Sequence, residues 1–128
     1  MKYTITFKTA QQWLSNINDL IDIYQYDDSL TMDIEWALYQ NFKYLNQGQN
    51  SFNKQKQELI VKYGTLQEDD SYVVDTDCDI TMSRYNQSLN ELMDTKIKTP
   101  LEKIDHKTLI GKKGVTLDTM TLFDFMII

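Results

Sequence analysis

The chain has 128 residues, of which 41% are hydrophobic, and this predicts one globular domain over residues 1–128 with a core of its own. Its 13 basic and 19 acidic residues give a net charge of −6, which argues against a general affinity for nucleic-acid phosphates. No apolar run approaches the roughly 18 residues of a membrane-spanning helix, so we expect no membrane partner.

Residues 2–7 alternate polar and apolar side chains, which is typical of a strand rather than of a secretory signal. A helix is predicted to follow, from an N-cap at Thr9 to about Tyr24, because its apolar residues recur at spacings of three and four. The short turn after Tyr24 favours an antiparallel hairpin with the next helix.

Residues 31–63 read as one long helix around which the rest of the chain is organised. Its apolar stripe repeats every seven residues, at Leu38, Leu45, Phe52 and Leu59. Gly48 lies in a polar midsection and leaves three alternatives open: a close helix crossing, a kink, or two separate helices. We favour a continuous helix because the seven-residue phase survives across Gly48. Gly64 is expected to end the helix as a C′ glycine.

The segment after the long helix is predicted to form a short hairpin, with a strand at residues 71–74 and an arm at 66–70. A turn at 75–79 leads into a helix that begins at Thr81 or Ser83 and reaches about residue 94.

The C-terminal part is predicted to add a strand at 96–101, which pairs with residues 2–7 as an edge strand because Pro100 lacks an N–H. A basic loop at 106–114 and a last helix then follow, the helix capped by Thr116 or Asp118 and carrying Leu117 among its apolar residues. The predicted fold class is α+β: a helical bundle around one long central helix, with a small antiparallel sheet at one end.

Acidic residues form two groups that are candidate partner-binding sites. One group is Asp27, Asp28, Asp33 and Glu35, at the tip of the predicted helical hairpin, and the other is Glu68, Asp69 and Asp70. A solvated surface that promotes solubility is one interpretation. The other is an acidic face that binds a basic partner.

Trp36 and Tyr44 fall outside the main stripe of the long helix, and we consider them together with Trp13 and Tyr39 as one aromatic group. Either another element covers this side, or the rings are exposed anchors for a partner, since Trp and Tyr dominate binding hot spots. We include Trp36 among the candidate partner-binding residues.

No motif predicts catalysis, a cofactor or a metal. Residues 75–79 begin like a calcium loop but lack its glycine and its closing glutamate, so no metal ligand is assigned there. His106 has no nucleophile nearby in sequence, and the acids around Cys78 are expected to raise its pKa. Residues 111–114 only superficially resemble a phosphate-binding loop. We therefore expect a protein that is not an enzyme.

The order of features resembles a family of small, mostly uncharacterised helical proteins from tailed phages and prophages of Gram-positive bacteria. Residues 58–64 close a long helix, 68–74 form an acidic turn and a strand, and 89–98 lead from a helix into a lysine-rich strand before the apolar C-terminal helix. The resemblance implies a viral origin and no known catalytic residues.

These observations predict a phage-encoded protein that inhibits a host factor, such as a defence nuclease in an anti-CRISPR-like manner, by blocking a basic surface in the host cytoplasm. One alternative is a virion, tail or assembly component, and another is a weak divalent-metal-binding factor. The expected partner is a host or phage protein without direct nucleic-acid binding, and the oligomeric state stays open.

Overall fold

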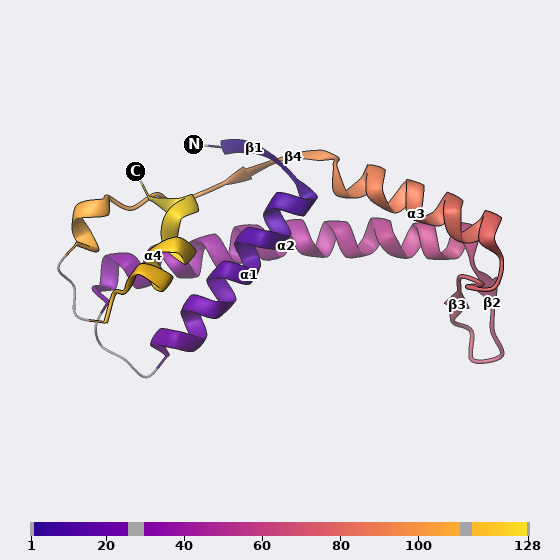
Figure 1. Cartoon of the computed structure of the whole chain (residues 1–128), viewed down its shortest axis with the longest axis horizontal. Helices are drawn as coiled ribbons and strands as arrows, with labels where there is room; N and C mark the ends of the chain where they lie inside the picture. The colour runs from indigo at the N-terminus through magenta and orange to yellow at the C-terminus, as the bar shows by residue number, and fades with distance from the viewer. Residues whose placement is uncertain (1, 26–29, 111–113, 128) are drawn as a thin grey trace.

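One helix runs the length of the molecule. The computed structural model describes residues 2–25, 30–110 and 114–127. Helix α2 (Met32–Tyr63) is unbroken over 32 residues, or about 48 Å, and the other elements lie along it (Figure 1). The predicted long helix and its continuity through Gly48 are both confirmed.

Helix α1 (Phe7–Tyr24) crosses the N-terminal half of α2 at an angle (Figure 1). It follows strand β1 (Lys2–Thr6) directly. The predicted N-cap was wrong: Thr6 caps the helix, and its hydroxyl accepts a hydrogen bond of 3.1 Å from the Thr9 amide. The helix starts earlier than predicted because Phe7 is its first core residue rather than the last residue of the strand.

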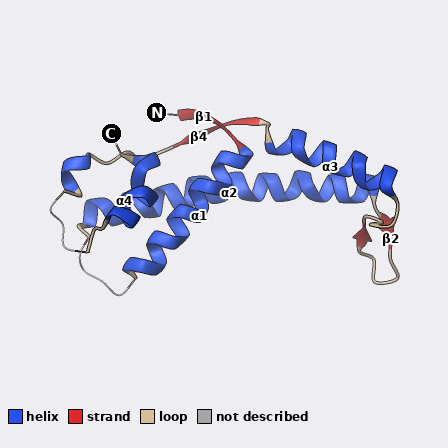
Figure 2. Ribbon diagram, in the orientation of Figure 1, coloured by secondary structure: helices blue, strands red, loops and turns tan. Residues whose placement is uncertain are grey.

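The two sheets are small and antiparallel. Strand β4 (Lys96–Pro100) pairs with β1, as predicted, and the register places Ile5 opposite Ile97. Figure 2 shows the two strands together above α2. Strands β2 (Thr65–Leu66) and β3 (Tyr72–Val73) form the predicted hairpin just beyond the C-terminal end of α2. The α+β class around one central helix is therefore confirmed.

Helix α3 (Asp79–Met93) packs along the C-terminal half of α2 (Figure 1). It begins two residues before Thr81, the earlier of the two predicted starts, with Cys78 at the N-cap position. Asp79 then lies in the first turn, where the helix dipole favours a negative charge.

The C-terminal region folds over the N-terminal half of α2. It contains the 3₁₀ helix η1 (His106–Thr108), helix α4 (Leu117–Phe123) and the 3₁₀ helix η2 (Asp124–Met126). Thr116 caps α4 through a reciprocal pair of hydrogen bonds with Thr119, as one of the two predicted caps. Leu117, one of the apolar residues of this helix, is 84% exposed, because α4 buries the side of Thr119 and Phe123 instead.

The apolar stripe of α2 is shared by two clusters. The larger cluster packs the N-terminal half of α2 against α1, the chain after β4, and α4, and it includes Leu38 and Leu45. The smaller cluster joins Phe52 to Phe7 and Leu92, with the rings of Phe7 and Phe52 centred 5.6 Å apart. One face of the helix therefore organises two sets of partners in succession.

A fully buried asparagine attaches the chain after β4 to α2. The Asn41 side-chain oxygen accepts a hydrogen bond of 2.7 Å from the Glu102 amide, and its nitrogen donates one of 2.9 Å to the Glu102 carbonyl. The side chain thus satisfies both backbone groups of one residue, as a neighbouring strand would. Leu101 and Ile104, on either side, are buried.

Removing this amide should destabilise the fold. Asn41→Ala leaves the backbone groups of Glu102 without these partners. We therefore expect the free energy of unfolding, measured in urea, to fall by roughly 1–3 kcal/mol. Asn53→Ala is the matched control, because Asn53 is exposed on the same helix and its side chain accepts one hydrogen bond from Gln49. If Asn41→Ala lowers the free energy of unfolding no more than the control does, the hydrogen bonds of Asn41 contribute nothing to stability.

Gly48 within α2 and Gly64 directly after it should respond to alanine with opposite signs. A Cβ at Gly48 would meet the Ile97 side chain at 3.4 Å, an ordinary contact, so Gly48→Ala should stabilise the helix by about 0.5–1 kcal/mol. Gly64 ends α2 as predicted, but its φ of −93° is not left-handed. A Cβ there would lie 2.3 Å from the Ile60 carbonyl oxygen, so Gly64→Ala should destabilise by about 1–3 kcal/mol.

Thermal unfolding of the two glycine variants beside the wild type measures both signs. A lower midpoint for Gly48→Ala would mean that the contact with β4 is tighter than the geometry indicates.

Candidate functional site

Helix α2 carries an exposed apolar ridge on the side opposite its core face. Met32, Trp36 and Tyr39, here called the aromatic ridge, are 75%, 51% and 57% exposed. Their spacings of four and three place them on one side of the helix, away from the buried Leu38. Lys43 closes the ridge, with its ammonium group 5.3 Å from the centre of the Tyr39 ring. Exposed aromatic residues in a row are typical of a protein-binding surface.

A groove between α1 and α2, here called the α1–α2 groove, runs along one side of the ridge. It has a volume of about 270 Å³ and is lined mainly by apolar side chains. Leu20 and Leu38 are buried in it, while Ile21 and Tyr39 are exposed. Among the described residues that line this groove, only Glu35 is charged.

A second groove lies on the other side of the ridge, between α2 and residues 102–108, with a volume of about 500 Å³. Met32 and Trp36 line it from α2, and Lys103, Ile104 and Thr108 line it from the opposite segment. The hydrogen bonds of Asn41 to Glu102 fix the start of that segment, so the ridge stands between two grooves of defined shape.

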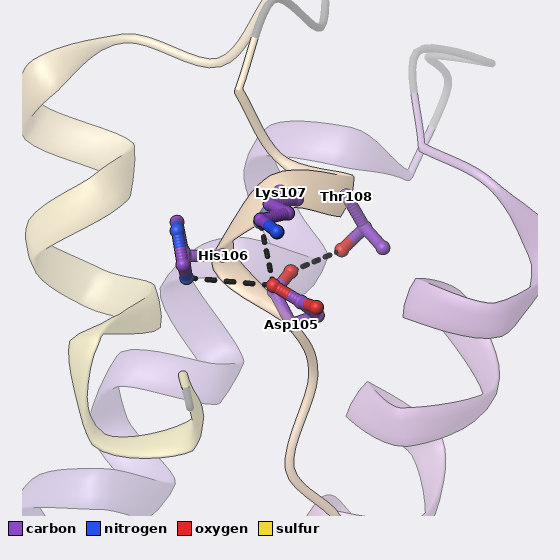
Figure 3. Close-up of polar contacts among 4 residues, drawn as sticks. All are labelled: Asp105, His106, Lys107 and Thr108. Atoms are coloured by element: carbon purple, nitrogen blue, oxygen red, sulfur yellow. Dashed lines mark hydrogen bonds and ion pairs between the residues drawn. The ribbon is translucent and has the colours of Figure 1, made fainter.

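Asp105 organises the far end of the second groove (Figure 3). Its carboxylate accepts a hydrogen bond of 3.0 Å from the Lys107 amide, and its carbonyl accepts one of 2.6 Å from the Thr108 hydroxyl. His106 Nδ1 lies 3.4 Å from the same carboxylate, and both side chains are exposed. His106 therefore belongs to a capped turn that shapes the groove wall.

The predicted partner-binding residues lie at two ends of the molecule. Asp33, Glu35 and Trp36 are exposed at the N-terminal end of α2, beside the aromatic ridge. Glu68, Asp69 and Asp70 are exposed in the β2–β3 loop, beyond the C-terminal end of the same helix (Figure 1). Asp27 and Asp28 lie outside the described residues. The structure therefore brings Asp33 and Glu35 together with the ridge and separates them from Glu68, Asp69 and Asp70 by the length of α2.

The β2–β3 loop holds its acidic side chains through its own hydrogen bonds. The Ser71 hydroxyl and amide donate to the Asp69 carboxylate at 2.6 and 3.1 Å, and these bonds lower the pKa of Asp69. Asp70 adopts a left-handed conformation with φ of 66°, which an aspartate tolerates better than most residues. The loop is a defined acidic turn.

An internal hydrogen bond also defines the turn over residues 75–79. The Asp75 carboxylate accepts this bond from the Asp77 amide at 2.9 Å. Within residues 2–25, 30–110 and 114–127, no group of three or more His, Cys, Asp or Glu side chains is arranged to hold a metal ion.

Sequence reasoning identified Trp36 and Glu35 but missed the roles of Ile21, Met32 and Asn41. A usable signal was present for Asn41, because it falls between Leu38 and Leu45 on the apolar stripe. Ile21 and Met32 carried no such signal, since an apolar residue near a helix end is equally compatible with burial.

No family model, curated protein or solved structure matches this chain. In the described part of the chain, no helix combines the length and the apolar character needed to cross a bilayer.

Cys78 differs from its expected chemistry. The Thr81 hydroxyl donates a hydrogen bond of 3.2 Å to the Cys78 sulfur, and this bond lowers the pKa of the thiol. The charge of Asp75 acts in the expected direction and raises it, but the hydrogen bonds dominate. The net pKa of Cys78 is therefore lowered rather than raised, although Asp75 acts on it in the expected direction.

Thr81→Val should raise the pKa of Cys78, because the thiolate loses the hydroxyl donor that stabilises it. The rate of iodoacetamide alkylation should then fall near neutral pH, and the midpoint of its pH profile should move to higher pH. Thr81→Ser keeps the hydroxyl and is the control. Equal profiles for the Val and Ser variants would exclude the hydrogen bond as the cause.

Proposed function

We propose that this chain is a non-enzymatic, phage-encoded protein that acts in the host cytoplasm by binding a host protein and blocking a basic surface. A nucleic-acid-binding face of a defence nuclease is the kind of surface it would occupy, as an anti-CRISPR-like inhibitor does. The observation that carries the proposal is the aromatic ridge set beside Asp33 and Glu35 at one end of α2.

The charge distribution supports a basic partner for this end. Residues 9–42 contain six acidic residues and no Lys or Arg. The charge of this stretch is therefore −6, the same as the net charge of the whole chain. An acidic surface attracts a basic one during encounter, and it repels acidic proteins and nucleic acids. Trp36 and Tyr39 add the kind of aromatic anchor that supplies most of the binding energy in protein interfaces.

A second candidate function is that of a virion, tail or assembly component. It is favoured by the exposed apolar side chains at both ends of α2 in the described structure, such as Met32 at one end and Leu66 at the other. Mass spectrometry of purified particles distinguishes the two functions, because an inhibitor acting in the host cytoplasm would be absent from the particles.

Charge reversal at the ridge should weaken inhibition. We expect the wild-type protein to displace labelled duplex DNA from a susceptible defence nuclease in fluorescence anisotropy. Asp33→Lys with Glu35→Lys should weaken this competition about tenfold, or about 1.4 kcal/mol. Glu58→Lys with Glu91→Lys is the matched control, because both residues are exposed in the other half of the molecule and the net charge changes equally.

Two results would contradict the proposal in different ways. If both double variants lose competition equally, the effect reports net charge and the site is wrong. If the wild-type protein displaces DNA from none of a panel of purified defence nucleases of Gram-positive bacteria at micromolar concentration, the proposed inhibitor function is wrong.

A further inference from the structure

We propose that the α1–α2 groove receives one amphipathic helix of the partner protein. That helix would bury an aliphatic side chain between α1 and α2 and place a Lys or Arg beside Glu35. The inference rests on the proposed function, since it names the part of the partner that this end of the chain recognises.

The size of the groove selects a side chain. Its volume of about 270 Å³ is below the roughly 300–1,000 Å³ of pockets that hold small-molecule ligands. Buried Leu20 and Leu38 present an apolar floor, and exposed Ile21 and Tyr39 stand at the rim. An aliphatic side chain inserted there would meet apolar atoms from two helices at once.

The groove is also suited to a helix. Its walls are two helices that cross at an angle (Figure 1), and a third helix laid between them would complete the packing of a small bundle. Recognition of an amphipathic helix in an apolar groove uses anchors spaced three and four residues apart. The open edges of β1 and β4 lie over the middle of α2, so strand addition would not reach this groove.

Charge complementarity identifies the partner as basic and sets its orientation. Glu35 is the charged residue among the described lining of the groove, and Asp33 is exposed two residues before it. Lys43 lies at the opposite end of the ridge, against Tyr39. Basic side chains of the bound helix would therefore lie at the Glu35 end.

A second copy of this chain is a poor occupant, because its corresponding end carries the same negative charge. Two copies meeting at this groove would bring Glu35 and the neighbouring exposed Asp33 of each copy together, and these like charges repel. The electrostatics thus favour a different, basic protein over self-association at this groove.

The test uses the full-length protein and a synthetic peptide of about 15 residues made only of Leu and Lys, with its leucines on one helical face. A peptide of the same composition with the leucines dispersed around the helix is the control ligand. In a titration followed by ¹⁵N NMR, the amphipathic peptide should shift the amides of Ile21, Leu38 and Tyr39, and the dispersed peptide should bind at least fivefold more weakly.

Variants separate the groove from general electrostatic attraction. Ile21→Ala should weaken binding of the amphipathic peptide about five- to tenfold, because the groove loses a rim contact. Val61→Ala, an equally exposed aliphatic position at the other end of α2, should leave binding unchanged. Glu35→Gln should weaken binding to the amphipathic peptide more than Glu58→Gln does.

The outcomes are decisive in either direction. Equal binding of both peptides, shifts confined to the Glu68–Asp70 loop, or no effect of Ile21→Ala would overturn the groove as a helix-binding site. If Ile21→Ala leaves displacement of DNA from the nuclease unchanged while the Asp33 and Glu35 reversal abolishes it, the helix inference fails and the proposed function stands. If the peptide binds as expected but no nuclease is inhibited, the groove stands and the proposed function fails.

Discussion

The arrangement of the candidate site depends on the amide of Asn41. This side chain is fully buried, and both of its polar atoms are used on the backbone of Glu102. A leucine in the same position would fit the apolar stripe but would leave the Glu102 amide and carbonyl without these partners. The two hydrogen bonds of the Asn41 amide go to the N–H and C=O of a single residue, Glu102. They therefore fix which residues of the following segment face α2. Leu101 and Ile104 are buried as a consequence, and Lys103 and Asp105 line the groove.

The exposed ridge follows from how α2 is covered. Its core face turns toward α1, α4 and the chain after β4 in one half, and toward α3 in the other. A helix packed on one face keeps its opposite face in water unless a further layer is added. In this chain of 128 residues the other described elements pack against the core face of α2 along its length, so none of them covers the opposite face. Met32, Trp36 and Tyr39 remain outside as a result, and the surrounding carboxylates keep this apolar surface hydrated.

The parts of the fold that sequence could predict are those governed by local periodicity. The repeat of Leu38, Leu45 and Phe52 predicted α2 and its passage through Gly48, because a helix keeps its phase whatever packs against it. Helix starts were less predictable: several hydroxyl and acidic residues compete to cap, and the choice of Thr6 over Thr9 depends on where Phe7 is buried. The sequence predicted that Gly64 ends the helix, but it did not predict why a glycine is needed there. The need comes from the closeness of the Ile60 carbonyl, which is a property of the folded chain.

The candidate site was predictable only in part for the same reason. Periodicity showed that Trp36 lies off the stripe, but only the folded structure shows that no described element covers it. The place of Asn41 on the apolar stripe was a signal, but its partner could not be predicted, because Glu102 is 61 residues away and contributes backbone groups that any residue has. The two acidic groups carried no information on their separation, which is set by the unbroken length of α2 between Asp33 and Glu68.

That separation limits how the two acidic ends can act. They are joined by a helix of about 48 Å, whereas electrostatic interactions between exposed charges are screened over about 8 Å at physiological ionic strength. The carboxylates of the β2–β3 loop therefore add nothing to the field at the aromatic ridge. They contribute to affinity only if one partner spans the length of α2, or if a second partner binds there. If one partner binds both ends, the two patches on that partner must be spaced by the length of α2. Binding at both ends then gains affinity from the fixed spacing. The continuity of α2 through Gly48 thus sets the spacing at which one partner would have to reach both ends.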